Sequence, residues 1–349
     1  MSERRTAVKV PKRTAEKLLR AMLSAGILDE SRKISKRDGS VVIPLTSSPE
    51  FDVATYGAEL LREVDLPPRL ARTDPAARLE VEFAKERIPK SAIPRKWRRL
   101  GDVVIFRLPP EARKNGEAVG RIFAEALAAR TIVEDRSGIH GPLRTPDVRL
   151  LWGDETETVH VEAGIRYRLD VSRVMFSPGN TAERIGIAQR VRPGDVVVDL
   201  FAGIGYFTLP IALRSKPSMV YACELNPVAF RYLVENIRLN RADHVVPLLG
   251  DCRETAPKGV ADWVLMGHFD ARDYLDVGFR CLRGRGTIVY HDVCPKEHVP
   301  EEPIRRIAAA APSNWMRVVG IEHRIVKSYA PGIVHVVIHA RVEPTMRHR

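Results

Sequence analysis

The chain has 349 residues, of which 44% are hydrophobic and 29% charged, and its formal net charge at pH 7 is +12. This length predicts two or three domains, and this hydrophobic content excludes a disordered chain. No apolar run approaches the ~18 residues that a membrane span needs, and the first residues lack the apolar stretch of a signal peptide, so we expect a cytoplasmic protein.

The charge balance and the cysteines narrow the class of protein. Lys and Arg number 56 against 44 acidic residues, a balance that suits a polyanionic partner and is also found in many soluble basic proteins. Cys223, Cys252, Cys281 and Cys294 form no Cys-x-x-Cys pair, which argues against a disulfide framework, a zinc ribbon and an iron–sulfur cluster. We therefore expect four reduced thiols and no bound metal.

Residues 1–66 are expected to form a small basic module. Thr14–Leu28 has apolar residues at helical spacing, and Ser40–Leu45 predicts a strand after a turn at Arg37–Gly39. Nine Lys and Arg residues lie between positions 9 and 37, and they indicate either a contact with RNA or a solvated charged face. A proline-rich link from Leu66 to Pro75 then separates this module from the rest of the chain.

Residues 76–170 are expected to form a middle α/β domain that binds RNA. Its first part, residues 84–99, has seven basic residues and one acid, and its prolines prevent a simple amphipathic helix. Gly101–Leu108 then predicts a strand and Glu117–Ala129 a helix. Basic loops with an aromatic side chain suit a phosphate backbone and an unstacked base. The candidate RNA contacts are Arg95, Lys96, Trp97, Arg98 and Arg99.

Residues 171–349 alternate predicted strands with predicted helices. The strands are Val196–Leu200, Met219–Cys223, Val245–Leu249, Trp263–Met266, Thr287–Tyr290, Val318–Glu322 and Ile333–Ala340. The helices are Phe207–Leu213, Pro227–Leu239, Ala271–Leu282 and Glu302–Ala311. This alternation predicts an α/β fold with a doubly wound, Rossmann-type parallel sheet that ends in an antiparallel pair.

The segment Asp195–Phe207 predicts a binding site for a cationic ligand. Its strand ends at Asp199, and Gly203 and Gly205 form a tight turn before the next helix. A dinucleotide fingerprint has no acid before its glycines and has a third glycine where this sequence has Phe207. Because a carboxylate there repels a pyrophosphate and attracts a cation, the motif favours S-adenosylmethionine, which carries a sulfonium and an ammonium group.

Two further acids end the next two strands of the predicted sheet. Glu224 follows the second strand and is placed to accept both hydroxyl groups of a ribose, and Asp251 follows the third strand and is placed to accept from an adenine amino group. Each acid alone is also compatible with a helix cap. Because the carboxyl ends of successive parallel strands form one crevice, three acids there indicate a ligand site.

These motifs resemble the archaeal and eukaryotic enzymes that modify the purine 3′ of the tRNA anticodon, namely the guanosine-N1 methyltransferases and the wybutosine aminocarboxypropyltransferases. The resemblance covers most of the chain, and residues 1–66 resemble the N-terminal module of the methyltransferases, which touches the tRNA elbow. It rests on Asp199–Gly205, Asn236–Asn240, Gly250–Glu254, Ile93–Arg95, Gly101–Val104, Phe176–Pro178 with Glu183–Arg184, and Tyr329–Gly332.

Two departures separate the two branches of this family. The methyltransferases have an Asn-Leu-Pro or Asn-Pro-Pro-like loop after the fourth strand, whereas this sequence has Met266–Asp270 with neither Asn nor Pro. They also tend to have His-Arg-Glu before a linker glycine, where this sequence has Val161 in place of the arginine. The Met266–Asp270 loop and the segment Met175–Asn180 resemble the aminocarboxypropyl-transferring branch.

The motifs and the resemblance together give a set of site residues. Glu183 and Arg184 are expected to be catalytic, and His268 is a candidate catalyst or a packing residue. Lys327 and Tyr329 are expected either to contact tRNA or to cap the terminal hairpin. The expected contacts with S-adenosylmethionine are Phe176, Ser177, Asp199, Phe201, Ala202, Gly203, Gly205, Glu224, Leu225, Asp251 and Cys252.

The resemblance implies a class I methyltransferase-like fold, preceded by the two smaller domains, and a specific reaction. A monomeric enzyme would transfer the 3-amino-3-carboxypropyl group of S-adenosylmethionine to C7 of 4-demethylwyosine at position 37 of phenylalanine tRNA and release methylthioadenosine. Two alternatives stay open. One is an S-adenosylmethionine-dependent methyltransferase acting on guanosine 37 or on the wyosine base, and the other is a non-catalytic tRNA-binding protein, against which the three acids argue.

Overall fold

The structure is a computed structural model that describes residues 6–37, 39–64, 66–67, 75–141, 143–177 and 180–345. The chain divides into two compact units, Met1–Arg78 and Leu79–Arg349. Within the described residues, no helix is both long and apolar enough to cross a membrane. The finer division into a module of residues 1–66, a middle domain and a domain of residues 171–349 stays a prediction.

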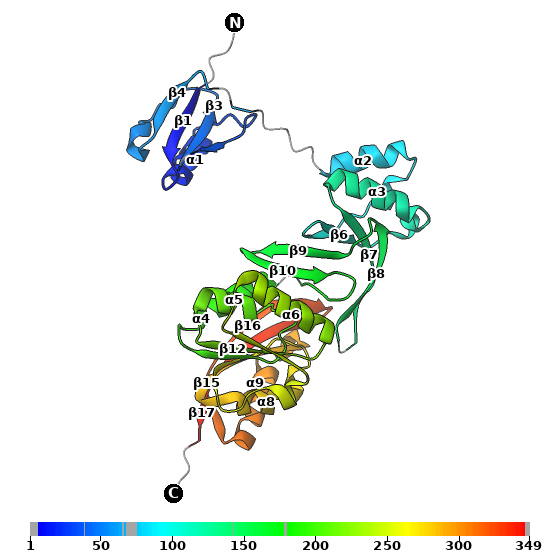
Figure 1. Ribbon diagram of the computed structural model, residues 1–349, viewed down its shortest axis with the longest axis vertical. Coiled ribbons are helices and arrows are strands. Elements are labelled where there is room, and N and C mark those ends of the chain that lie inside the picture. Colours follow the sequence, from blue (N-terminus) through cyan, green and yellow to red (C-terminus); the bar gives the residue numbers. More distant parts are fainter. Residues whose placement is uncertain are drawn as a thin grey trace. The chain divides into compact units, whose positions relative to one another are not determined.

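The first unit is a four-stranded antiparallel sheet in the order β2-β3-β1-β4 with one α-helix, α1, against it (Figure 1). The predicted strand Ser40–Leu45 is confirmed as β3, whereas the predicted helix is shorter, because the chain turns at Gly26 with φ +67° and Leu28 then bridges to Leu45. The elements are β1 Thr6–Pro11, α1 Ala15–Ser24, β2 Ser35–Arg37, β3 Ser40–Leu45, η1 Val53–Tyr56 and β4 Glu59–Arg62.

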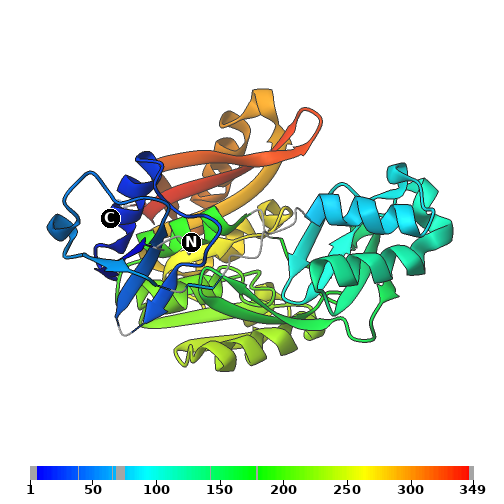
Figure 2. The same cartoon turned by 90° about the horizontal axis from the view of Figure 1, so that it is seen from above.

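The first part of the second unit is a four-stranded sheet in the order β5-β6-β7-β8, covered on one face by the helices α2 and α3, which lie side by side (Figures 1 and 2). The expected strand Gly101–Leu108 is confirmed as the shorter β6, and Gly101, with φ +56°, lies in the turn that joins it to β5. The elements are α2 Pro75–Lys85, η2 Lys90–Ala92, β5 Trp97–Leu100, β6 Val103–Phe106, η3 Pro110–Asn115, α3 Gly116–Leu127, β7 Thr131–His140 and β8 Thr145–Trp152.

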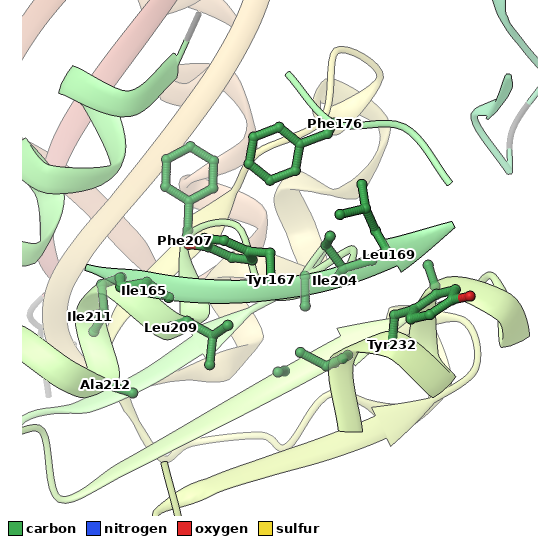
Figure 3. Close-up of a cluster of buried hydrophobic side chains, with 14 of the residues drawn as sticks. Ile165, Tyr167, Leu169, Phe176, Ile204, Phe207, Leu209, Ile211, Ala212 and Tyr232 are labelled. Atoms are coloured by element: carbon green, nitrogen blue, oxygen red, sulfur yellow. The ribbon is translucent and has the colours of Figure 1, made fainter. Parts of the chain in front are cut away.

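A second hairpin, β9 Glu157–Glu162 and β10 Ile165–Asp170, joins this sheet to the C-terminal one. Alternate residues of β10 are buried, and Figure 3 shows Tyr167 in one cluster with Phe176 and Phe207. The fully buried Asn236 of helix α6 accepts from the Arg168 N–H of β10 (2.6 Å) and donates to the carbonyl of Ile204 (3.1 Å). This amide therefore fixes β10 against the glycine turn that follows β11.

The C-terminal part is a seven-stranded sheet in the order β13-β12-β11-β14-β15-β17-β16, in which the first five strands are parallel and β17 and β16 antiparallel. Helices α4, α5 and α6 lie on one face and α8 and α9 on the other (Figure 1). The doubly wound α/β fold is thus as predicted. The strands are β11 Val196–Asp199, β12 Met219–Glu224, β13 Val245–Leu249, β14 Ala261–Met266, β15 Leu282–Pro295, β16 Met316–Ala330 and β17 Ile333–Pro344.

The helices of this part differ little from their predicted positions, whereas its last strands are longer than predicted. Figure 2 shows the long β16–β17 hairpin in orange to red. Most of β16 is exposed or half-buried, and polar residues interrupt its apolar ones from Glu322 onward, so only its first apolar residues gave a strand pattern. The helices are α4 Thr181–Arg190, α5 Thr208–Ser215, α6 Pro227–Asn240, α7 Cys252–Thr255, η5 Ala271–Tyr274, α8 Leu275–Cys281, η6 Lys296–His298, α9 Glu301–Ala310 and η7 Pro312–Asn314.

Candidate active site

A cavity of about 380 Å³ lies at the carboxyl ends of β11, β12, β13 and β14, and is closed by the β7–β8 turn and the β16–β17 hairpin. Its position agrees with the rule that open parallel sheets bind ligands outside the carboxyl ends of their strands. Of the expected contacts, the residues that line it are Ser177, Phe201, Gly203, Glu224, Leu225, Asp251 and Cys252, together with His268.

The glycine turn after β11 forms the floor of this cavity. Gly203 has φ +59°, and a Cβ atom there would lie 2.4 Å from the ring of Tyr206, so no other residue fits without moving that ring. Gly205 has φ +101° and packs against Leu209, beneath the cavity, and Ala202 is fully buried. Gly203 therefore faces the ligand space, whereas Ala202 and Gly205 shape the turn from below.

Glu224 connects two backbone turns and faces the cavity. Its carboxylate accepts from the Gly203 N–H (2.7 Å) and from the Asn226 N–H (2.7 Å), one bond on each oxygen. Burial raises the pKa of Glu224, and the backbone hydrogen bonds from Asn226 and Gly203 oppose this rise. Each oxygen keeps a lone pair for a further donor, so the side chain can accept from a diol in the cavity.

Asp251 both caps a helix and lines the cavity, the two roles expected of an acid at the end of its strand. It caps α7 by accepting from the Arg253 N–H (2.8 Å), and it forms an ion pair with the Arg253 guanidinium (2.6 Å) that lowers the pKa of the carboxyl group. It also lines the cavity. The Arg253 guanidinium in turn lies 5.0 Å from the centroid of the Tyr274 ring, which fixes this corner of the site.

Aromatic side chains build the wall between these two acids and the Met266–Asp270 loop. The ring of His268 stacks on Phe201 with their centroids 5.3 Å apart, and Tyr274 meets Phe201 edge-on at 5.2 Å. His268 Nδ1 accepts from the Asp270 N–H (3.2 Å), and burial lowers the pKa of the imidazole. His268 is therefore a neutral ring in the cavity wall, placed as a stacking residue. Its catalytic role stays a prediction.

Asp199 lies behind the cavity, although it is among the expected contacts with S-adenosylmethionine. Its side chain is fully buried and is absent from the cavity lining. One carboxylate oxygen accepts from the Phe201 N–H (3.2 Å) and the other from the Thr208 hydroxyl (2.8 Å). These contacts stabilise the entry to α5, so we assign Asp199 to the support of the glycine turn.

Glu183, Arg184 and Phe176 also lie outside the cavity lining, although the resemblance implied that they act in the site. The buried Arg184 pairs with Glu162 (2.7 Å), donates to the Ser177 carbonyl (2.7 Å) and lies over the rings of Phe176 and Tyr206. The buried Glu183 pairs with Arg324 and lies 3.6 Å from a ring nitrogen of His339. Arg184 thus positions Ser177, and Glu183 fixes the edge hairpin to α4.

Four of the five candidate RNA contacts line a second, open cavity of about 770 Å³ on the middle sheet, which we call the basic groove. Arg95, Lys96, Trp97 and Arg98 lie there with Arg107, and the only acid in its lining is Asp135. Arg99 does not line the groove, because its guanidinium donates to the carbonyls of Leu127 and Ala128 at the end of α3. It caps that helix instead.

Sequence reasoning missed two residues that enter the cavity from distant segments. Arg144 comes from the β7–β8 turn of the middle sheet, and His335 comes from β17. Only His335 gave a signal, because it is a polar residue in the otherwise apolar run Ile333–Ile338 and such a residue usually has a partner or a function. It bonds to the buried ring of His291 (3.0 Å between nitrogens).

The buried Asp199 predicts a pH dependence of stability. Burial raises its pKa from 3.8 to about 6, so the folded protein binds this proton more tightly than the unfolded chain does. The stabilisation of the folded protein by this tighter proton binding is therefore fully present below about pH 4 and is lost as the pH rises to about 6. Relative to Asp199→Asn, the free energy of unfolding of the wild type should fall by about 2–3 kcal/mol between pH 4 and pH 7, as measured by urea unfolding. Parallel pH profiles for the two proteins would contradict this.

The two acids of the cavity predict a loss of ligand affinity. We expect Glu224→Gln and Asp251→Asn each to weaken the binding of S-adenosylmethionine by about 1–3 kcal/mol in calorimetry, because a buried donor of the ligand loses its charged acceptor. The exposed Asp243→Asn should bind as the wild type does and serves as the control. Wild-type affinity in both cavity variants would remove these acids from the site.

Three family models match consecutive parts of the chain. They are described as the tRNA methyltransferase 5 N-terminal domain (residues 7–52), the TYW2 N-terminal domain (residues 82–156) and the TRM5/TYW2 methyltransferase domain (residues 158–319). The first and the second models carry the names of different enzymes.

The chain is similar to proteins named as aminocarboxypropyltransferases and to proteins named as guanine-N1 methyltransferases. The tRNA(Phe) (4-demethylwyosine(37)-C(7)) aminocarboxypropyltransferase of Methanocaldococcus jannaschii is 43% identical over 249 residues, which are 71% of this chain and 98% of that protein. The tRNA (guanine(37)-N(1))-methyltransferase Trm5b of Pyrococcus abyssi is 32% identical over 96% of this chain and 98% of its own length. The crystal structure of Pyrococcus horikoshii TYW2 in complex with MeSAdo matches with a TM-score of 0.70 and 35% identity, over 77% of this chain and 99% of that one. The chain therefore belongs to the TRM5/TYW2 family of tRNA-modifying enzymes, in its aminocarboxypropyltransferase branch.

Proposed function

We infer that this protein transfers the 3-amino-3-carboxypropyl group from S-adenosylmethionine to C7 of 4-demethylwyosine at position 37 of phenylalanine tRNA, with release of methylthioadenosine. The observation that carries this conclusion is the 43% identity to an enzyme named for that reaction, across 98% of its length. Structures of two archaeal relatives hold AdoMet and MeSAdo, the substrate and the by-product of such a transfer.

The residues of the cavity fit S-adenosylmethionine. Glu224 offers two oxygens to a ribose diol, and Asp251 offers an acceptor to an adenine amino group. Phe201 and Tyr274 present aromatic surface between them. The volume of about 380 Å³ lies in the range of small-molecule sites. These residues support an adenosine-containing ligand in the crevice where the fold predicts a site.

The sulfonium activates the γ-methylene carbon of S-adenosylmethionine toward a nucleophile. C7 of the base forms a bond to that carbon, the carbon–sulfur bond breaks with its electron pair going to sulfur, and the C7 proton then passes to water. The protein contributes mainly by positioning, because a misplacement of ~1 Å can cost about a hundredfold in rate. Glu224 and Asp251 fix the adenosine end, and Phe201 and His268 define the wall beside it.

Methyl transfer is the alternative function, and two observations favour it. Residues 7–52 match the methyltransferase N-terminal domain, and the match to Trm5b covers 96% of the chain. The loop after β14 argues against it. Gly267 packs against Phe207, His268 stacks on Phe201, and Phe269 meets Tyr329 and His335 edge-on at 5.0 Å. This loop offers no asparagine to orient the N1 atom of a guanine.

A labelling experiment separates the two reactions. With tRNA that carries 4-demethylwyosine, label from the carboxyl carbon of S-adenosylmethionine should enter the RNA, and methylthioadenosine should accumulate. Label from the methyl carbon should stay with the by-product, and tRNA with unmodified guanosine at position 37 should accept little of either. S-adenosylhomocysteine as the main product would establish methyl transfer instead.

The basic groove supports binding of tRNA by the middle sheet. Four cationic side chains line the groove together with the ring of Trp97, which packs edge-on against Phe123 (5.6 Å) and is thus held in place for a base or a ribose. We propose that the groove contacts the tRNA backbone and that residues 1–66 add a further contact. We also propose that the enzyme acts as a cytoplasmic monomer.

The groove proposal predicts a change in salt dependence. Replacing Arg95, Lys96 and Arg98 together by alanine should weaken tRNA binding and reduce the slope of log K against log salt by about 0.7–0.9 for each phosphate contact that is lost. Arg99 is left in place because it caps α3. Filter binding between 50 and 200 mM salt measures the slope.

The control for this experiment replaces three exposed basic residues that line neither cavity, Arg238, Lys258 and Arg285. It changes the net charge by the same amount as the groove variant. Equal slopes for the groove variant and this control would show that the groove is only a solvated charged surface.

A further inference from the structure

Two histidines in the wall of the catalytic cavity form a buried, hydrogen-bonded pair. His291 of β15 and His335 of β17 both line the cavity, and the two residues are only 2% and 1% exposed. Their strands are antiparallel neighbours, and the Nδ1 atom of His291 lies 3.0 Å from the Nε2 atom of His335. Phe207 meets the first ring edge-on at 5.3 Å, and Phe269 meets the second at 5.0 Å. The packing therefore holds both rings in place.

This pair keeps a capacity for hydrogen bonding that the folded protein does not use. Two neutral imidazoles that share one hydrogen bond always leave one outer nitrogen with a lone pair and the other with a proton. The outer nitrogens here are Nε2 of His291 and Nδ1 of His335, and the second of these is buried without a hydrogen-bond partner. Buried polar atoms without a partner are rare in native structures, and a catalytic role is one of the few reasons for them.

Burial keeps both rings neutral, so the lone pair of the histidine pair is free at neutral pH. It lowers the pKa of His291, and the charge of His335 lowers that pKa further. Burial, with a smaller effect from the charges of Lys327 and Arg324, also lowers the pKa of His335 to about 4. A neutral imidazole can accept a proton, whereas an imidazolium cannot.

The other imidazole and the three acids of the described lining are less suited to accept a proton. His268 Nδ1 accepts from the Asp270 N–H, so the lone pair of that ring is already used. Glu224 accepts two backbone N–H bonds and is placed for the ribose, and Asp251 pairs with Arg253. The side chain of Asp270 is 65% exposed, so a proton that reached it would already be in water.

Substitution at C7 requires this carbon to lose its proton. When C7 bonds to the γ-methylene carbon, the base becomes a cation in which C7 carries both the new chain and the proton. Until the proton leaves, the sulfur of the bound methylthioadenosine can take the chain back. We propose that the His291–His335 pair accepts this proton before it reaches water. The proposal rests on the proposed function, because that reaction substitutes C7.

The step balances within the cavity. The electron pair of the C7–H bond returns to the ring system of the base and restores its aromaticity, and the proton goes to the outer lone pair of the histidine pair. The two rings then share one positive charge through an N–H···N bond that is stronger than the neutral one, because it is charge-assisted. This bond offsets the low proton affinity that burial gives each ring. The proton passes to water when the products leave.

The test uses the full-length enzyme and tRNA whose 4-demethylwyosine carries either hydrogen or deuterium at C7. His291→Gln and His335→Gln each remove one imidazole and keep an amide that can bond to the remaining ring. Each should lower the single-turnover rate of transfer by roughly a hundred- to ten-thousandfold, the contribution typical of general acid–base catalysis. Because proton loss then limits the rate, the deuterated tRNA should react several-fold more slowly in both variants. The wild type should show little difference between the two tRNAs.

The matched control is His339→Gln. His339 lies four residues after His335 on the same face of β17, burial lowers its pKa to about 4 as well, and it does not line the cavity. This variant should keep the rate of the wild type and its small isotope effect. All three variants should bind S-adenosylmethionine with wild-type affinity in calorimetry and keep the wild-type unfolding temperature, which separates proton transfer from damage to the fold.

Two results would overturn the proposal. Wild-type rates in both cavity variants would show that the C7 proton passes directly to water. Lower rates that are equal for the deuterated and the undeuterated tRNA would show that the two rings only shape the cavity. Formation of S-adenosylhomocysteine by the wild type, in place of methylthioadenosine, would instead refute the proposed function.

Discussion

The site depends on the carboxylate of Glu224, because this one group holds together the turns that define it. One oxygen accepts from Gly203 in the turn after β11, and the other accepts from Asn226 at the start of α6. Asn226 caps α6 through Val228 and also donates to Leu143, which precedes Arg144. Through these four hydrogen bonds, a strand-end acid and the asparagine that it holds align the glycine turn, a helix and the tip of a hairpin that begins more than 80 residues earlier in the chain.

The sequence predicts the doubly wound sheet well because its parallel strands lie between helices on both faces of the sheet and are therefore apolar runs. The strands β11 to β14 have this pattern, and their helices start with recognisable caps such as Asn226 with Pro227. Strands that mix polar and apolar residues give a weaker pattern. β7 to β10 were not predicted, although β7 begins with four buried residues and β10 alternates buried with exposed ones, and β16 was predicted over a third of its observed 15 residues.

For the site, prediction succeeded where backbone topology alone decides position. Glu224 and Asp251 end parallel strands and therefore meet at one edge of the sheet. Prediction was less successful where the position of a site residue depends on the direction of its side chain, because the sequence does not show to which side a strand-end residue turns. Asp199 turns inward to Thr208, and Glu183 turns toward Arg324. Arg144 and His335 required the tertiary fold, since nothing near them in the sequence places them at the cavity.

The two halves of the cavity have different functions. One binds the adenosine, and the other determines which carbon of S-adenosylmethionine is transferred. The adenosine half is built on the ends of β11 to β13, and it serves any transfer from S-adenosylmethionine because both reactions keep the adenosine in place. The other half is built from the β7–β8 turn, the Met266–Asp270 loop and the edge hairpin, all of which lie outside those strands. Aromatic and cationic side chains occupy that half, around Phe269. A change in this second half can therefore redirect the reaction to another carbon without disturbing the bonds of Glu224 that hold the first.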